Sequence, residues 1–374
     1  MRKTFVIACG GTGGHLSPGI ALAERLTADG FRCILVVSRK KIDVRLLKKY
    51  PQFKFRRAPG IGLKFSFGGL LKFCVSQFSA IVFAFCFLLK NRPAAFVSFG
   101  GFMSLGLTLV CKVLFIPVFL HEANRVPGKA VRWLSRVATR VYLPPGVRVK
   151  GLSPLVFRSA GLPVRREIRP LPKAECRKKL GLPEKGKLIA VFGGSQGAAA
   201  LNDWILGDWE KFAAAGVSVY CVTGPENSNG DTLHEAVSAA GEPVAARIVP
   251  FCDMMAEALS AADLIVSRAG AGTLAECIAC RVPAVLVPFP YAADDHQAAN
   301  AKYYQEKGAG LLAPQSEIGS LTETVLDVIS DDALLARFRD GIERLSLEYV
   351  WDNVVSDLEQ YATKKLKIFR SEQA

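Results

Sequence analysis

Glycine turns that follow short apolar runs are the residues of this 374-residue chain best suited to hold a phosphate group. Backbone N–H groups in such a turn, together with the start of the next helix, can bind an anion without a cationic side chain. The turns are Gly10-Gly11-Thr12-Gly13-Gly14, Gly100-Gly101, Gly193-Gly194-Ser195-Gln196-Gly197 and Gly270-Ala271-Gly272. A single turn of this kind is equally typical of a tight turn without a ligand. Several of them in two domains favour a nucleotide or a diphosphate.

Two side chains of the first half of the chain are candidates to take a proton from a reacting hydroxyl group. His15 follows the first turn at an expected helix start, and a neutral imidazole there can act as a general base. Glu122 is the first acidic residue after Asp43 and lies within a long basic region. His15 could instead bind a diphosphate or cap the helix, and Glu122 could form a structural ion pair with a neighbouring arginine. The sequence leaves these alternatives open.

The glycine turns require strands and helices that place them at one edge of a sheet. Apolar, β-branched runs that end at the turns or at other short loops predict buried strands at residues 4–9, 33–38, 94–99, 116–120, 188–192, 217–223, 247–249 and 264–267. A helix-forming stretch at 19–28 follows the first turn. Alternating strands and helices with glycines at the strand ends are typical of α/β proteins with a doubly wound parallel sheet.

The pattern of strands and turns occurs twice, which predicts two α/β domains in tandem. Gly and Pro residues at 161–165 break regular structure and mark the junction. We therefore expect a first domain at 1–162 and a second at 163–340. The segment 341–374 is expected to contain a helix, at 341–362, that packs back toward the first domain, followed by a basic tail.

The positive charge of the chain is concentrated in its first half. Residues 1–162 carry 26 basic and 4 acidic side chains, a net charge of +22, whereas residues 163–374 have a net charge of −7. Half of the residues are hydrophobic, which argues against disorder. A basic field of this kind fits a nucleic acid or an anionic membrane surface.

The uncharged segment 73–89 favours the membrane over the nucleic acid. It is slightly shorter than the roughly 20 residues of a membrane-spanning helix, and polar residues dilute it, so we interpret it as a helix with an unusually apolar outer face. Its expected membrane contacts are Phe73, Phe78, Val82 and Phe85. The sequence therefore predicts a peripheral membrane protein without a nucleic-acid partner.

Several other chemistries fit the sequence poorly. Leu16 occupies the place of the third glycine of a dinucleotide fingerprint, and the second strand ends at Ser38-Arg39-Lys40-Lys41 without the acidic residue of that fingerprint, which disfavours NAD; Arg39 leaves a weak NADP alternative. Cys277 and Cys280 have no second pair or histidine cluster nearby, so we predict no metal site. The sequence also has no Asp-x-Asp metal motif, and no cofactor is predicted.

Taken together, the ordered motifs resemble those of the MurG family, the N-acetylglucosaminyltransferases that convert lipid I to lipid II in peptidoglycan synthesis. The motifs are Gly10-Gly11-Thr12-Gly13-Gly14-His15, Gly100-Gly101-Phe102, His121-Glu122-Ala123-Asn124, Pro163-Val164-Arg165, Gly193-Gly194-Ser195-Gln196-Gly197-Ala198 and Arg268-Ala269-Gly270-Ala271-Gly272-Thr273-Leu274-Ala275-Glu276. The match runs in register from about residue 3 to about residue 345.

This resemblance implies a GT-B architecture, in which two Rossmann-like doubly wound domains face a cleft. It implies that GlcNAc moves with inversion from UDP-GlcNAc to the MurNAc hydroxyl of undecaprenyl-pyrophosphoryl-MurNAc-pentapeptide. It also implies a location at the cytoplasmic face of a bacterial inner membrane. Partners would be that anionic surface and other proteins of wall synthesis or division.

The resemblance also assigns residues to roles, with His15 as the family's candidate base and Glu122 as the competing one. The acceptor diphosphate would be bound by Gly13, Gly14, His15, Gly100 and Gly101. The donor would be bound by Thr12, Gly13, Gly14, Asn124, Arg165, Ser195, Gln196, Phe251, Cys252, Met255, Ala271, Glu276, His296, Gln297 and Asn300. Among these, Glu276 would accept from the ribose hydroxyls and Phe251 would stack on uracil.

Three positions depart from the family pattern, namely Val131, Leu162 and His296. His296 puts some donor contacts in doubt, and none of the three removes a proposed catalytic group. Alternatives from the same fold class and from others remain at this stage: a diacylglycerol glycosyltransferase, an NADP-binding oxidoreductase, or a nucleotide-sugar binding subunit without activity.

Overall fold

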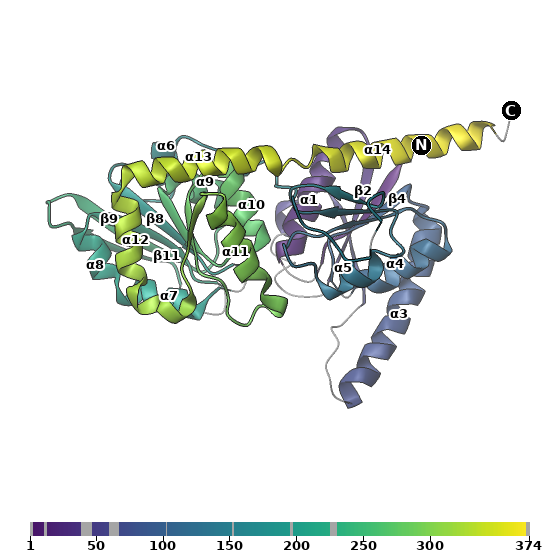
Figure 1. Ribbon diagram of the computed structural model, residues 1–374, viewed down its shortest axis with the longest axis horizontal. Coiled ribbons are helices and arrows are strands. Elements are labelled where there is room, and N and C mark those ends of the chain that lie inside the picture. The colour runs from purple at the N-terminus through teal and green to yellow at the C-terminus, as the bar shows by residue number, and fades with distance from the viewer. Residues whose placement is uncertain are drawn as a thin grey trace. The chain divides into compact units, whose positions relative to one another are not determined.

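The apolar runs of the sequence form the inner strands of two parallel sheets, one in each of two compact units (Figure 1). The first unit comprises Met1–Arg165 and Tyr349–Ala374, and the second comprises Arg166–Glu348. The computed structural model describes residues 3–10, 13–38, 47–59, 67–101, 103–151, 153–194, 197–224 and 230–371. Of the helical residues 13, 67–74, 103 and 364–371, only the backbone is described.

The first unit alternates strands and helices along the chain. Its elements are β1 (Thr4–Ala8), α1 (Gly13–Ala28), β2 (Arg32–Val37), β3 (Lys54–Arg57), α3 (Phe67–Asn91), β4 (Ala95–Ser98), α4 (Met103–Val113), β5 (Val118–His121), α5 (Lys129–Leu134), β6 (Arg140–Leu143), β7 (Phe157–Ser159) and α14 (Asp352–Ser371). Within the described residues, the strands form a seven-stranded sheet in the order β3-β2-β1-β4-β5-β6-β7. All neighbours pair in parallel.

Burial explains only in part which strands could be seen in the sequence, since the buried strands β6 and β13 were not predicted. Every residue of β1, β4 and β5 is buried, as expected for central parallel strands covered on both faces. By contrast, the edge strand β3 has the sequence Lys-Phe-Arg-Arg, and its side chains are exposed or partly exposed. Strand β3 was not predicted, because its residues lack the apolar pattern of a buried strand.

Helix α3 is longer than the expected segment 73–89 and has two different faces. Leu88 is fully buried and Phe87 is 9% exposed, so one face belongs to the core. Phe78 and Phe85, on the other face, are 69% and 44% exposed. In Figure 1, the last turns of α3 run beside α4, and its first turns extend away from the body of the unit. Among the described residues, no helix combines the length and apolar character that crossing a bilayer requires.

The second unit repeats the α/β pattern. Its elements are α6 (Lys173–Lys179), β8 (Lys187–Phe192), α7 (Ala199–Gly207), α8 (Trp209–Ala214), β9 (Val217–Val222), β10 (Thr232–Val237), β11 (Pro243–Val249), α9 (Met255–Ala261), β12 (Leu264–Ser267), α10 (Ala271–Cys280), β13 (Ala284–Leu286), the 3₁₀-helix η1 (Ala293–Asp295), α11 (His296–Glu306), β14 (Gly310–Leu312), the 3₁₀-helix η2 (Gln315–Ser320), α12 (Leu321–Ser330) and α13 (Asp332–Glu348). As far as it is described, its sheet has seven strands in the order β10-β11-β9-β8-β12-β13-β14, and only β10 is antiparallel.

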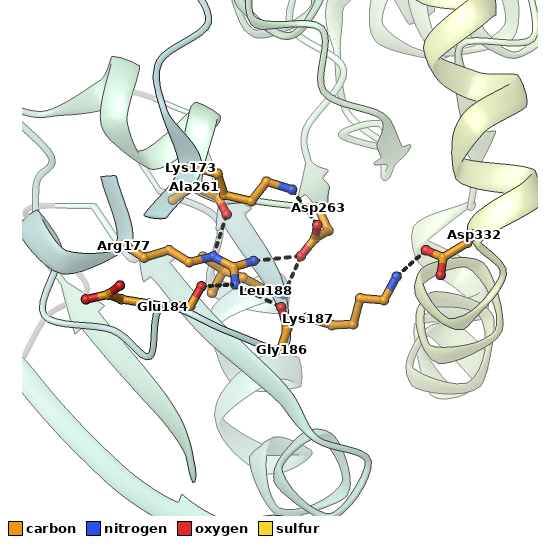
Figure 2. Close-up of polar contacts among 9 residues, drawn as sticks. All are labelled: Lys173, Arg177, Glu184, Gly186, Lys187, Leu188, Ala261, Asp263 and Asp332. Carbon is orange, nitrogen blue, oxygen red and sulfur yellow. Dashed lines mark hydrogen bonds and ion pairs between the residues drawn. The ribbon is translucent and has the colours of Figure 1, made fainter. Parts of the chain in front are cut away.

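A buried ion pair fastens the start of this unit to its sheet (Figure 2). The guanidinium of Arg177 donates to the carboxylate of Asp263 at 2.8 Å and to the carbonyl of Gly186 at 2.8 Å. The same carboxylate accepts from the backbone N–H of Leu188 at 2.9 Å and from Lys173 at 2.5 Å. Helix α6, strand β8 and the start of β12 are therefore joined by one carboxylate.

The last two helices, α13 and α14, belong to different units and are separated by a short non-helical segment. We expected one helix over 341–362 with a domain border at 340, but α13 continues to Glu348 and a separate helix α14 begins at Asp352. Helix α14 belongs to the first unit, where the Tyr142 hydroxyl donates to Asp357 at 3.1 Å. Within the first unit, the N–H of Gly161 donates to the carbonyl of Val350 at 2.9 Å, which joins the end of the main segment to the residues that lead into α14.

Candidate active site

His15 lies against the second glycine turn of the first unit. Gly100 and Gly101 have φ angles of +100° and +86°, a conformation that glycine adopts without strain. A Cβ atom on Gly100 would lie 3.6 Å from Nε2 of His15, so the imidazole lies within van der Waals range of the turn. The turn itself is fixed by Ser98, whose hydroxyl accepts from the Gly100 N–H at 3.1 Å, and by Ser104, whose hydroxyl donates to the Gly100 carbonyl at 2.7 Å.

The first glycine turn leads directly into α1. Gly13 and Gly14 are the first residues of this helix, while Thr12 lies outside the described residues. The helix packs closely on β1, because a Cβ atom on Gly19 would lie only 2.3 Å from Cβ of Cys9. This close approach places the start of α1 at the carboxyl edge of the sheet, with backbone N–H groups that the helix itself cannot pair.

Glu122 holds together the loop between β5 and α5. One carboxylate oxygen accepts from the backbone N–H of Asn124 at 2.9 Å and from its side-chain amide at 3.1 Å. The other oxygen accepts from the N–H of Gly128 at 2.8 Å. Glu122 is only 7% exposed, so these bonds compensate the burial of its charge.

His121 lies before Glu122 at the end of β5 and is 1% exposed. Its Nε2 lies 3.0 Å from the carbonyl of Gly161, and because a carbonyl can only accept, this nitrogen carries the proton. Burial lowers the pKa of His121 to about 4, which the bond to Gly161 offsets only in part. His121 is therefore neutral at physiological pH and anchors the backbone at Gly161, near the end of the first unit's main segment.

Replacing His121 with Gln should reduce the acid sensitivity of the fold. The unfolded chain binds a proton near the ordinary pKa of 6.5 and the folded chain only near 4. The stability due to this difference is therefore complete above pH 6.5 and declines as the pH falls toward 4. At pH 5, this effect lowers the free energy of unfolding of the wild-type protein by about 2 kcal/mol. Urea unfolding at pH 7.5 and pH 5 measures it, and an equal pH-dependent loss in both proteins would contradict this role.

Arg165 lies at the C-terminal end of the first unit's main segment and is 7% exposed. Its guanidinium is 3.4 Å from the hydroxyl of Tyr50, a buried ring that stacks on Phe53. The structure therefore places this expected donor contact against the side chains of its own unit.

In the second unit, the turn after β8 is tightly folded. A Cβ atom on Gly193 would lie 2.2 Å from the backbone nitrogen of Ala198, and Gly194 has a φ angle of +81°. Both positions consequently require glycine. Ser195 and Gln196, which are expected to bind the donor, lie outside the described residues.

Asn202 is a residue beside this turn that the sequence analysis did not select. It is 4% exposed, and its amide donates to the carbonyl of Thr223 at 3.0 Å. Thr223 in turn donates its hydroxyl to the carbonyl of Val249 at 3.3 Å. These bonds join the first helix after the turn to the ends of β9 and β11. A polar residue at a buried position of α7 was the available signal.

The residues expected around the uracil follow β11. Phe251 is partly buried, and Met255, also partly buried, is the first residue of α9. Cys252 is buried, and its sulfur accepts from the hydroxyl of Tyr220 at 3.4 Å. Burial raises the pKa of the Cys252 thiol, so it stays neutral.

Helix α10 begins directly after the fourth glycine turn. Ala271 is its first residue, so its N–H is among those that the helix itself leaves unpaired. Glu276 lies in the second turn of the same helix and is partly buried. Both residues thus occupy the carboxyl side of β12, next to β8 in the sheet.

Arg268 and Gln297 hold the loop between β13 and α11. The Arg268 guanidinium donates to the carbonyls of Val287 and Pro288 at 3.1 and 3.2 Å and lies over the Phe289 ring, 5.5 Å from its centre. The side-chain oxygen of Gln297 accepts from the N–H of Phe289 at 2.9 Å. The side-chain oxygen of Gln297, an expected donor contact, is therefore already bonded within the protein.

Asn300 and His296 also make bonds inside the second unit. Asn300 is 3% exposed, and its amide donates to the carbonyl of Ala269 in the fourth glycine turn at 3.0 Å. His296 donates from Nδ1 to the carbonyl of Ala293 at 2.8 Å. Helix α11 is thereby fixed to the turn before α10, which orients the three expected donor-binding residues of α11.

Each unit therefore places several of its described site candidates at the carboxyl edge of its own sheet, the usual ligand site of open α/β sheets. The first unit brings His15, Gly14, Gly100 and Gly101 together, and the second brings the turns after β8 and β12 together. Within the described part of the chain, no group of three or more His, Cys, Asp and Glu side chains could hold a metal ion.

Known proteins match the chain over most of its length. Residues 5–143 match the glycosyltransferase family 28 N-terminal domain, and residues 188–340 match the C-terminal domain of that family. A relative from Opitutus terrae, named UDP-N-acetylglucosamine--N-acetylmuramyl-(pentapeptide) pyrophosphoryl-undecaprenol N-acetylglucosamine transferase, is 48% identical over 96% of this chain and 95% of its own. A relative of the same name from Carboxydothermus hydrogenoformans is 35% identical over 90% and 92%.

Solved structures agree with these matches. MurG from Acinetobacter baumannii superposes with a TM-score of 0.67 and 25% identity, covering 97% of this chain and 100% of that one. The glycotransferase of kitacinnamycin, 15% identical with a TM-score of 0.69 over 96% and 99% of the two chains, shares the fold. Two tandem units of this kind define a glycosyltransferase of GT-B architecture. The chain belongs to glycosyltransferase family 28 and, within it, to the MurG family.

Proposed function

We propose that the protein transfers GlcNAc from UDP-GlcNAc to the MurNAc hydroxyl of undecaprenyl-pyrophosphoryl-MurNAc-pentapeptide, converting lipid I to lipid II. The observation that carries the proposal is the 48% identity, over 96% of the chain, to a relative named for this transfer. Membership of the MurG family leaves the NADP-dependent oxidoreductase without support.

In the proposed reaction, the acceptor oxygen attacks the anomeric carbon of GlcNAc while the bond from that carbon to UDP breaks. UDP leaves with the bonding electron pair, and the proton of the acceptor hydroxyl moves to His15. The imidazole is partly exposed and lies against Gly100 and Gly101, where the acceptor diphosphate would bind. His15 is thus the proposed general base.

The leaving diphosphate needs stabilisation as it gains charge. We assign this to backbone N–H groups in the turns after β8 and β12, among them that of Ala271 at the start of α10. Glu276 would accept from the ribose hydroxyls, and Phe251 and Met255 would contact the uracil. The contacts of Gln297 and Asn300 inside the unit would hold the sugar-binding helix in place.

Transfer of labelled GlcNAc from UDP-GlcNAc to a lipid I analogue tests the proposed function. Diacylglycerol serves as the competing acceptor, because a related lipid glycosyltransferase would use it instead. Product from the lipid I analogue alone is the expected result.

We also propose that the first unit binds the cytoplasmic face of the inner membrane through one face of α3, here called the α3 surface. It consists of Val75, Phe78, Ile81, Val82, Phe85 and Leu89, which are 38% to 69% exposed. Phe73 was expected to belong to it, but its side chain lies outside the described residues. Six exposed apolar side chains on one helix, in a region with a net charge of +22, are typical of an interfacial helix near anionic lipid.

Replacing Phe78 and Phe85 with Ser should weaken binding to anionic vesicles about tenfold or more, because each ring loses its burial in the interface. Binding of the wild-type protein should rise with the anionic lipid fraction and fall with salt. Vesicle co-sedimentation measures both effects.

The matched control for this experiment is Leu347→Ser, which removes an apolar side chain that is 76% exposed in the second unit. It should bind vesicles like the wild type. Equal binding by the Phe78/Phe85 variant, or indifference to lipid charge and salt, would refute the proposed surface.

A further inference from the structure

The carboxylate of Glu122 has both oxygens occupied by its own loop. Oε1 accepts two bonds from Asn124, at 2.9 and 3.1 Å, and Oε2 accepts one from Gly128 at 2.8 Å. A Cβ atom on Gly128 would lie 3.5 Å from Oε2, so the backbone runs directly past the carboxylate. All three bonds reach the loop that joins β5 to α5.

This arrangement is poorly suited to a general base. A base must take a proton on one oxygen during the reaction. Each Glu122 oxygen already receives an N–H group, and a protonated oxygen would give up at least part of that bonding. With 7% of its surface exposed, the side chain also has little contact with solvent.

The same bonds are well suited to shaping the loop. A carboxylate can only accept hydrogen bonds, so the bond from Nδ2 fixes which end of the Asn124 amide faces Glu122. At the start of the loop, His121 is fixed by its bond to Gly161. The amide of Asn124 is therefore oriented before any substrate binds.

We propose that Glu122 is a positioning residue that acts through Asn124 and the backbone up to Gly128, and is not the base. The inference rests on the proposed GlcNAc transfer, in which Asn124 belongs to the donor-binding set. The inference distinguishes Glu122 from His15, the two candidate bases, and leaves the role of general base to His15.

A double-mutant cycle tests the proposal in the full-length protein. Glu122→Gln keeps one acceptor oxygen and should lower kcat/KM for GlcNAc transfer by about 10- to 100-fold, as should Asn124→Ala. Because Glu122 acts through Asn124, the double variant should lie within about threefold of Asn124→Ala. The pH profile of kcat should keep its shape in Glu122→Gln. Glu235→Gln, an exposed glutamate on β10, is the matched control and should be fully active.

Amide hydrogen exchange supplies a readout that does not depend on turnover. In Glu122→Gln, the amides of Asn124 and Gly128 should exchange at least tenfold faster, while the urea midpoint shows that the variant is folded. The positioning role would be overturned if the losses of kcat/KM in the two single variants multiplied in the double variant. It would also be overturned if Glu122→Gln lost one limb of the pH profile of kcat, or if the amides of Asn124 and Gly128 exchanged at the wild-type rate. A wild-type protein that transfers no GlcNAc would instead overturn the proposed function.

Discussion

Replacing His15 with Gln is expected to lower kcat for GlcNAc transfer by about 10²- to 10⁴-fold. The imidazole lies beside Gly100 and Gly101, where a proton acceptor can reach a hydroxyl group of the bound acceptor. Gln preserves a polar side chain of similar length but cannot take up the proton. The affinity for UDP-GlcNAc should stay within about twofold, because the base acts in the transition state. Steady-state kinetics at saturating substrates and calorimetric titration of the donor measure the two quantities.

The matched control is His234→Gln, which alters an exposed histidine on β10 and should retain full activity. A His15→Gln protein with normal kcat at saturation, and with weakened binding of either substrate, would show that His15 only binds. The base would then have to be sought elsewhere at this edge of the sheet.

Replacing Asp263 with Asn should destabilise the second unit by about 3–5 kcal/mol. Arg177 has a side chain only 3% exposed, and Asp263 neutralises its charge at 2.8 Å (Figure 2). Asn has almost the same volume, so the loss would come from a buried guanidinium without its counter-charge. Urea unfolding should show this as an earlier transition of the second unit, since two-unit proteins need not unfold in one step.

Figure 2 also contains the control for this experiment. Lys187 pairs with Asp332, but the Asp332 side chain is 82% exposed, so Lys187→Gln should cost less than about 1 kcal/mol. In addition, replacing both Arg177 and Asp263 with apolar residues should recover much of the loss from Asp263→Asn. A small effect of Asp263→Asn would mean that water or other groups compensate the charge of Arg177.

The central strands could be predicted from the sequence because burial on both faces imposes continuous apolar runs. Strands β1 and β8 each end close to a glycine turn, which is visible without any structure. The edge strands β3 and β10 could not be recognised in this way, since their exposed or partly exposed side chains do not form a continuous apolar run. The break between α13 and α14 was also missed, because no Gly or Pro marks it in the sequence.

The types of the candidate site residues could be predicted, but their contacts could not. Glycine spacing identified the turns and the position of His15. The bonds from Asn300 to Ala269 and from Phe289 to Gln297 depend on tertiary packing, which no local pattern encodes. For the same reason, the sequence could not separate His15 from Glu122, whereas the three bonds around Glu122 distinguish their chemical settings.

The most direct test of the account is the yield of GlcNAc-containing lipid from UDP-GlcNAc and a lipid I analogue, measured side by side for wild type, His15→Gln and Glu122→Gln. The account predicts efficient transfer by the wild type, a loss of about 10²-fold or more in kcat for His15→Gln, and a smaller loss for Glu122→Gln. No transfer by the wild type, or a larger loss of kcat in Glu122→Gln than in His15→Gln, would contradict it.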